Sequence, residues 1–255
     1  MLLAFDMGNT HTEIGVLDGK NIVMTERVAT DLGKTDTEYG VLLHTILEIR
    51  GISPSAIEGA IISSVVPPLT GVLKSAVRMV TGRTALVVGP GVRNGLKLKI
   101  DNPRALGADL VVDAVGAIAL YGAPVIIIDM GTATTVCYVD EDRAFRGGLI
   151  IPGVNISLNA LSSETSQLPR ISLDDPGRVV GTNTIASMKS GIVYGQASML
   201  DGLIDRIREE MKSDAAVVAT GGLSGVITPF CRHEITLDPE LMLRGLQIIY
   251  AKNVS

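Results

Sequence analysis

One pattern occurs twice in the chain, about half a chain apart. Residues 2–18 read LLAFDMGNTHTEIGVLD and residues 125–140 read VIIIDMGTATTVCYVD. Each copy is an apolar run that ends in an aspartate, then Met-Gly and a polar tip, then a second apolar run that closes with another aspartate. Asp6 and Asp129 occupy the same place in the two copies. Such a repeat predicts two halves built on the same supersecondary unit.

The residues around each copy predict how the halves continue. Turn residues join each repeat to a third strand, at 21–29 and 144–151, so each half begins with a β-meander. Thr35 and Glu38 form a capping-box pattern, which opens a helix that Gly51 closes. Further helices are expected at about 67–82, 105–121, 153–162, 183–212 and 240–250, and further strands at 60–65, 86–88 and 215–219. We therefore expect an α/β chain with one half at 1–118 and the other at 119–255, and a cleft that the two halves share.

Composition excludes several classes of protein. The net charge is −5 and there is no dense basic run, which argues against a nucleic-acid partner. The longest uncharged stretch, residues 114–128, contains two glycines and a proline and is too short to cross a bilayer. Two cysteines and three histidines give neither a disulfide framework nor a zinc spacing. The sequence predicts a cytoplasmic protein that binds neither nucleic acid nor membrane.

The two repeated turns are candidate phosphate sites. A buried strand brings Asp6 to its end, Gly8 suits a tight turn, and the tip's N–H groups with Asn9 and Thr10 could face a polyphosphate. Asp6 would then hold a hydrated cation beside it. A single D-x-G-N-T also fits an ordinary β-hairpin with an Asx turn. The matched second copy favours two hairpins that grip one nucleotide.

Two further segments could carry chemistry. A strand that runs into Thr220-Gly221-Gly222 lets a ligand approach the backbone and would suit the adenosine of ATP, although such turns are also common in packing. Asp109 falls in the first turns of a predicted helix, where it either complements the helix dipole or acts as a general base. Asp113, one turn later, would raise the pKa of one of the two aspartates if both face the same cleft. No G-x-x-x-x-G-K-[ST] loop is present.

Taken together, these motifs resemble those of the type III pantothenate kinases. Other stretches do so too, including Ser63-Ser64-Val65-Val66-Pro67, Gly147-Gly148 with Pro152-Gly153, and Gly181-Thr182-Asn183-Thr184. The match runs in order along essentially the whole chain. The resemblance implies two duplicated ribonuclease H-like halves of the actin-like ATPase type. It also implies ATP-dependent phosphorylation of pantothenate to 4′-phosphopantothenate, the entry to coenzyme A.

The resemblance also implies roles for single residues. Asp109 would be the catalytic base, and Asp6 would hold Mg²⁺ through water. A monovalent cation, K⁺ or NH₄⁺, would lie near Asp129, and the enzyme would be a homodimer in which Thr184 reaches the partner's site. The implied ATP-binding residues are Asp6, Gly8, Asn9, Thr10, Gly131, Thr132, Gly221 and Gly222. The implied pantothenate-binding residues are Gly107, Ala108, Asp109, Leu110 and Thr184.

Two positions depart from the family's pattern. Leu110 stands where the family has an arginine, and Ile100 where members often have a tyrosine. Loss of an arginine removes a charge-assisted contact to an acidic substrate, about 1.5–3 kcal/mol for a hydrogen bond to a charged group. Three hypotheses stay open: a pantothenate kinase with a rearranged acceptor pocket, a kinase for a less acidic alcohol, and a nucleotide-binding regulatory protein without kinase activity.

Overall fold

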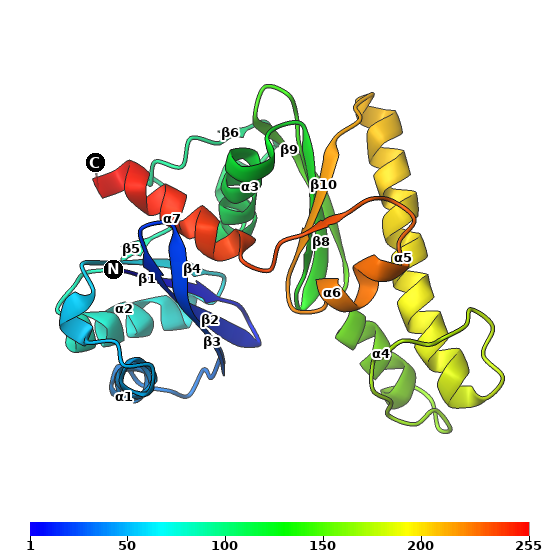
Figure 1. Cartoon of the computed structure of the whole chain (residues 1–255), viewed down its shortest axis with the longest axis horizontal. Coiled ribbons are helices and arrows are strands. Elements are labelled where there is room, and N and C mark those ends of the chain that lie inside the picture. Colours follow the sequence, from blue (N-terminus) through cyan, green and yellow to red (C-terminus); the bar gives the residue numbers. More distant parts are fainter. Residues whose placement is uncertain (255) are drawn as a thin grey trace. The chain divides into compact units, whose positions relative to one another are not determined.

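The computed structural model describes residues 1–254 and divides them into two compact units, each with its own sheet (Figure 1). Unit 1 comprises Met1–Gly95, Asn102–Gly116 and Met242–Ser255, and unit 2 comprises Leu96–Asp101 and Ala117–Leu241. The last helix therefore returns to the first unit. The boundary between duplicated halves at residue 118 is a statement about ancestry and stays a prediction.

Unit 1 contains a five-stranded sheet in the order β3-β2-β1-β4-β5. Its strands are β1 Leu2–Met7, β2 His11–Asp18, β3 Asn21–Ala29, β4 Gly59–Ser64 and β5 Leu86–Val87. β1 pairs antiparallel with β2 and parallel with β4. The central strand β1 is apolar along most of its length because both of its faces are covered.

Helices cover both faces of this sheet. Leu3, Phe5 and Met7 point into a core shared with α1 (Asp36–Ile49) and α2 (Pro67–Thr81). On the opposite face, α7 (Leu241–Val254) lies against the sheet, since a side chain at Gly15 would collide with Leu243. Figure 1 shows α1 and α2 on one side of β1 and β4 and α7 on the other. The face that carries Ala4 and Asp6 is therefore the α7 face.

Unit 2 repeats this topology. Its sheet has the order β11-β10-β7-β8-β9-β6, with β6 Lys97–Leu98, β7 Val125–Met130, β8 Ala133–Val139, β9 Ala144–Pro152, β10 Ala216–Thr220 and β11 Thr236–Leu237. The order 9-8-7-10-11 corresponds to 3-2-1-4-5, and β6 is an added edge strand. Both hairpins also have a register irregularity at the same place, between Val16 and Leu17 and between Tyr138 and Val139. The two duplicated α/β units predicted from the sequence are confirmed.

The helices of unit 2 gather on one face of its sheet. Ile126, Ile128 and Met130 pack against α4 (Val154–Ser163) and the long α5 (Thr184–Met211). The short α6 (Ser224–Ile227) follows β10. The sheet residues on the opposite face include Asp129, just as Asp6 lies opposite the α1 and α2 face in unit 1.

Most predicted elements lie within two residues of the observed ones. The capping box of α1 forms as expected, and Gly82 ends α2 with a left-handed backbone. Two helices differ more: α7 continues to Val254 instead of ending near 250, and α3 is Ala108–Tyr121, not 105–121, because Pro103–Ala105 forms a separate 3-10 turn before Gly107. The two-residue strands β6 and β11 and the helix α6 have too few residues for a periodic signal. No helix within residues 1–254 combines the length and apolarity that a bilayer span requires.

Candidate active site

The first hairpin tip is held by a threonine from the end of β3. The Gly8 amide donates to the carbonyl of His11 at 3.0 Å, which closes the turn. The Thr30 hydroxyl donates to the Gly8 carbonyl at 2.7 Å, and the Thr30 amide donates to the Thr10 carbonyl at 3.0 Å. Asn9 and Thr10 are exposed at the tip. A rigid turn thus presents two polar side chains to solvent, as a phosphate-binding tip requires.

The second hairpin tip is held by glycine packing. Gly131 and Thr132 are exposed between β7 and β8. A Cβ atom at Gly153, which precedes the first residue of α4, would lie 2.1 Å from the Thr132 carbonyl oxygen and 3.0 Å from that of Gly131. Only glycine permits this approach. The backbone at the start of α4 therefore lies directly against the tip.

Asp129 and the glycine turn after β10 lie together. Thr220 is the register partner of Asp129 on the neighbouring parallel strand. Gly221 follows with φ +89°, and a Cβ atom there would lie 2.4 Å from the Asp129 Oδ1 and 2.6 Å from the Met130 amide nitrogen. Asp129 and Gly221 are 92 residues apart in the sequence (221 − 129) and were predicted as separate candidates, and the fold brings them into contact.

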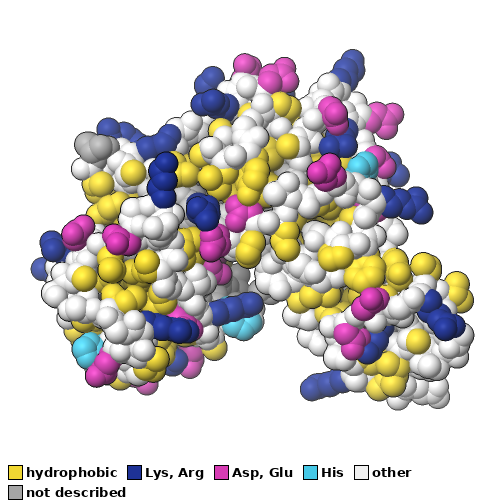
Figure 2. All heavy atoms as spheres, viewed as in Figure 1, with side chains coloured by type: hydrophobic (Ala, Val, Ile, Leu, Met, Phe, Trp, Pro, Cys, Tyr) yellow, Lys and Arg dark blue, Asp and Glu magenta, His cyan; other side chains and the backbone are white. Residues whose placement is uncertain are grey.

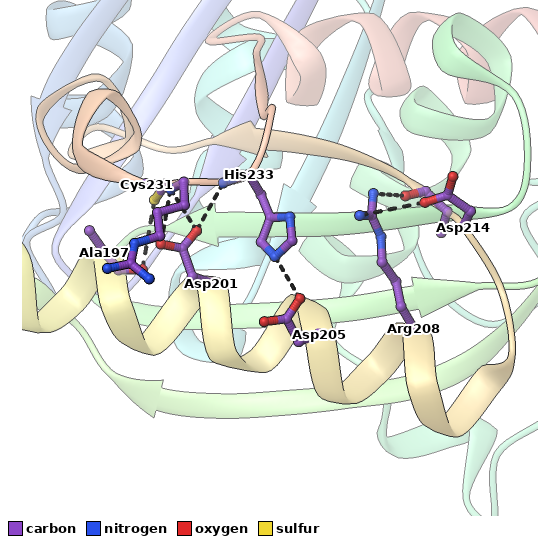
Figure 3. Close-up of polar contacts among 9 residues, drawn as sticks. Ala197, Asp201, Asp205, Arg208, Asp214, Cys231 and His233 are labelled. Carbon is purple, nitrogen blue, oxygen red and sulfur yellow. Dashed lines mark hydrogen bonds and ion pairs between the residues drawn. The ribbon is translucent and has the colours of Figure 1, made fainter.

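The chain beyond this turn is fixed to α5 by acidic side chains (Figure 3). Asp201 accepts hydrogen bonds from the backbone amides of Arg232 at 2.9 Å and His233 at 3.1 Å. The His233 ring lies 2.8 Å from Asp205. Figure 3 shows both aspartates projecting from α5 toward the 231–233 segment. The segment after the glycine turn is therefore anchored at its far end as well.

Asp109 lies in the first turn of α3 within unit 1. Its carboxylate folds back over Gly107, where a Cβ atom would lie 2.3 Å from Oδ1, so a residue with a side chain at 107 would displace it. Burial raises the pKa of Asp109, and the Leu110 amide that donates to Oδ1 at 2.8 Å works in the opposite direction. The cause is desolvation rather than repulsion from Asp113, which the helical spacing had suggested. A desolvated carboxylate with a raised pKa is a stronger general base.

The remaining predicted residues are distributed over both units. Ala108 and Leu110 flank Asp109 and are half-buried, and Ile100 is half-buried in unit 2. Thr184 is the exposed first residue of α5, after the N-cap Asn183. Unit 1 thus contains Asp6 with the first tip and Asp109, and unit 2 contains Asp129 with the second tip and the glycine turn.

Reasoning from the sequence passed over Glu13, Ser63 and the clamping role of Thr30. Glu13 is the register partner of Asp6 on β2, and Ser63 is its partner on β4. A charged residue among apolar ones could have singled out Glu13 in the sequence. That Glu13 lies beside Asp6 follows only from the strand register.

The oxygen donors beside the first tip suit a hydrated cation better than one held by protein ligands alone. Residues 1–254 contain no group of three or more His, Cys, Asp or Glu side chains arranged to hold a metal ion. Mg²⁺ bound with a nucleotide needs no such group, since one or two carboxylates, waters and phosphate oxygens complete its shell. The oxygen donors of Asp6 and Glu13 on one face of the sheet fit this hard cation.

Comparison with known proteins gives consistent results. The family model described as type III pantothenate kinase matches residues 2–206. A type III pantothenate kinase from Bacillus cytotoxicus is 43% identical over 253 residues, which cover 99% of this chain and 97% of that protein.

Solved structures agree on the fold. A conserved Baf family protein from Campylobacter jejuni superimposes with a TM-score of 0.60 at 17% identity, covering 98% of each chain. The (R)-2-hydroxyglutaryl-CoA dehydratase component A of Acidaminococcus fermentans has a TM-score of 0.58 at 17% identity, covering 100% of this chain and 99% of that one. At these identities the likeness concerns the fold alone.

Proposed function

Because the chain belongs to the type III pantothenate kinase family, we propose that it transfers the γ-phosphoryl group of ATP to the 4′-hydroxyl of pantothenate. The products are ADP and 4′-phosphopantothenate, and the reaction is the first step of coenzyme A biosynthesis. The observation that carries the proposal is the buried Asp109 carboxylate, seated over Gly107 in a chain that also has two matched phosphate-type tips. The full-length relationship to a kinase favours this function over a regulatory protein without catalysis.

Each tip offers donors of the kind that bind the phosphates of ATP. In unit 1 the donors are the backbone of Gly8 and the exposed Asn9 and Thr10 side chains. In unit 2 they are the backbone of Gly131 and the exposed Thr132. Gly221 and Gly222 accept the adenosine, since the backbone there has no side chain to keep a ligand away. The rigid support of each tip is what phosphoryl transfer needs, because its catalysis rests on positioning and charge stabilisation.

Asp109 acts as the general base. It takes the proton from the attacking 4′-hydroxyl as the oxygen–phosphorus bond forms and the bond to the ADP oxygen breaks. Burial raises the pKa of Asp109, which makes its carboxylate a stronger base for this task. Gly107 is required because its missing side chain leaves the space that the carboxylate occupies.

The acceptor pocket includes Gly107, Ala108 and Leu110 around this base. Leu110 donates no charged hydrogen bond to the carboxylate of pantothenate, so we expect weaker binding of the acid than an arginine at that position would give. Ile100 likewise has no hydroxyl to donate. Both departures affect the Michaelis constant for the acceptor rather than the binding of ATP.

Two cations complete the proposed chemistry. Mg²⁺ near Asp6 neutralises phosphate charge when bound. A monovalent cation, K⁺ or NH₄⁺, would be held near Asp129, whose Oδ1 lies 2.4 Å from where a Cβ atom at Gly221 would stand. Both thiols, Cys137 and Cys231, are reduced, which fits the expected cytoplasmic location.

The active form is a homodimer through unit 2. Apolar side chains that a monomer would expose occur in the loop before α5 and at the start of α5: Val180 is 77% exposed and Ile185 is 49% exposed. Figure 2 shows hydrophobic side chains at the surface over the α4 and α5 region. Exposed apolar patches on one surface are typical of protein interfaces. A second copy covering this surface would bring Thr184 to the partner's acceptor pocket, and sedimentation of wild type and Val180→Asp tests it.

Activity is tested directly with the purified protein, Mg-ATP, K⁺ and pantothenate. We expect 4′-phosphopantothenate, identified by mass, and ADP in equal amounts. ADP without phosphopantothenate would indicate another acceptor. Absence of both products at millimolar substrates, in a protein that still binds ATP, would contradict the proposal.

A further inference from the structure

A row of polar and charged residues crosses the sheet of unit 1 beside the first tip. Strand register places Ser63, Asp6, Glu13 and Arg27 next to one another on β4, β1, β2 and β3. Residues directly opposed on neighbouring strands point to the same face, with Cβ atoms about 4.5–5.5 Å apart. Two carboxylates, Asp6 and Glu13, are therefore side by side on the α7 face of the sheet.

The corresponding row in unit 2 shows that the fold does not require the second carboxylate. There the register places Thr220, Asp129, Thr135 and Ile150 next to one another. Thr135 occupies the position that Glu13 has in unit 1. A neutral residue therefore serves the sheet at this position, and Glu13 needs another explanation.

A charged glutamate at position 13 is expected to cost folding free energy, because its carboxylate is partly removed from water. Glu13 is half-buried, and its register partners are the carboxylate residue Asp6 on one side and Arg27 on the other. Arg27 is exposed and its guanidinium is also engaged with His11, at 2.9 Å from Nδ1. Two adjacent carboxylates in a partly desolvated place favour a cation between them.

The Ser63 hydroxyl points to the same conclusion independently. Ser63 is fully buried, and its Oγ has no hydrogen-bond partner among residues 1–254. Buried polar atoms without a partner are rare in folded proteins and call for a ligand, ion or water. This atom lies in the row next to Asp6, on the side away from Glu13.

We propose that Glu13 is a second carboxylate, beside Asp6, for the hydrated divalent cation that accompanies ATP, and that the Ser63 hydroxyl accepts or donates to a water of that ion. The proposal rests on the proposed function, since it deepens the nucleotide site of unit 1. Mg²⁺ uses one or two carboxylates together with waters and phosphates, which this row supplies. The row consequently repels metal-free ATP and accepts Mg-ATP.

The test measures nucleotide affinity with and without the metal. Isothermal titration with a non-hydrolysable ATP analogue is done in two buffers. One contains about 5 mM Mg²⁺, which saturates the analogue with metal, and the other contains EDTA. The variants are Glu13→Gln, which keeps the shape, and Glu13→Thr, which copies Thr135. Glu26→Gln is the matched control, because Glu26 is a glutamate of the same sheet whose partner is Arg50 on α1. Circular dichroism confirms that each variant is folded.

For wild type and the Glu26 control we expect a strong preference for the metal complex. In both Glu13 variants we expect affinity for the complex to fall about 10- to 100-fold and affinity for the metal-free analogue to rise. Electron paramagnetic resonance of Mn²⁺ with the analogue provides a second readout, with more free Mn²⁺ in the Glu13 variants. Ser63→Ala should give a smaller loss of the same kind.

Two results distinguish a failure of the proposed function from a failure of the proposed role of Glu13. If wild type binds no nucleotide under either condition, the proposed function fails. If wild type binds the nucleotide and the Glu13 variants keep the wild-type ratio of affinities, or bind the Mg²⁺ complex more tightly, this proposal alone is overturned.

Discussion

The two hairpin tips share a topology but are held in different ways. In unit 1 the Thr30 hydroxyl and amide bind the carbonyls of the tip. In unit 2 the backbone at Gly153 lies against the tip. Thr12 meets Thr30 at 2.9 Å, whereas its counterpart Thr134 is buried with no hydrogen-bond partner among residues 1–254. Duplication preserved the strands and their bulge, and the supporting contacts diverged.

The chemistry diverged in the same way. Unit 1 has the half-buried carboxylates with raised pKa values, Glu13 and Asp109, and unit 2 has the close glycine contacts around Asp129. On this difference we propose that proton transfer and divalent-cation binding belong to unit 1. Unit 2 supplies a rigid backbone surface. Each of the following experiments changes a residue of one unit and measures whether the role proposed for that unit is lost.

The largest effect is expected from Asp109→Asn. If proton transfer belongs to unit 1, kcat should fall about 10²- to 10⁴-fold with little change in the affinity for ATP. The activity of wild type should rise with pH through a pKa above the ordinary aspartate value of about 3.9. Initial rates across pH and a nucleotide titration check both points. Asp18→Asn, at the exposed end of β2, is the control, and an equal loss there would refute the assignment.

The same variant has a stability consequence with a definite sign. The folded-state pKa of Asp109 is raised, so its favourable contribution exists below the unfolded pKa and is lost as pH rises through the folded pKa. At neutral pH the asparagine variant should therefore be at least as stable as wild type, and the difference should shrink toward pH 4. Urea unfolding at both pH values measures it.

A smaller but substantial effect is expected from Gly221→Ala in unit 2. The positive φ and the contacts of 2.4–2.7 Å with Asp129 and Met130 should destabilise the protein by about 2–4 kcal/mol. The urea concentration at the midpoint of unfolding and the affinity for ATP should both fall. Gly202→Ala, in open space on α5, should instead stabilise by about 0.5–1 kcal/mol. Equal behaviour of the two variants would mean that the close packing in unit 2 is unimportant.

Thr30→Val tests the hydroxyl clamp of unit 1. It removes the bonds to Gly8 and Thr12, so we expect a loss of about 1–3 kcal/mol in the free energy of unfolding and weaker ATP binding. Thr25→Val, exposed on β3 and five residues before Thr30, should change stability by less than about 0.5 kcal/mol. A Thr30 variant that matches this control would show that the first tip is held without the hydroxyl.

The smallest effect concerns the thiols, both of which lie in unit 2. Burial, helped by the charge of Asp201, raises the pKa of Cys231 to about 12, and Cys137 is only 4% exposed. Native protein should therefore react negligibly with a thiol reagent at pH 8, and both cysteines should react after unfolding. Asp201→Asn should speed the labelling of Cys231, since it removes a negative charge and the anchor of the 231–233 segment. Rapid labelling of the native wild type would contradict the burial.

Much of the fold and part of the site were predictable because their signals are local. The aspartates at the strand ends, the capping box of Thr35 and Glu38, and the glycines after the strands all lie within a few residues of the features they specify. The predicted start of α3 is three residues too early because Pro103–Ala105 forms a separate 3-10 turn, and a proline there is equally typical of the first turn of an α-helix. The roles of the individual site residues remain predictions.

The amino-acid sequence by itself determined the duplicated units, the two tips and the candidate base, because each depends on a short run of residue types. Only the tertiary structure decided which residues stand beside them. Register placed Glu13 and Ser63 next to Asp6, and the pairing of β7 with β10 brought Gly221 against Asp129. The physical reason is that strand pairing joins residues far apart along the chain, and a shift of one residue would have turned each side chain to the other face.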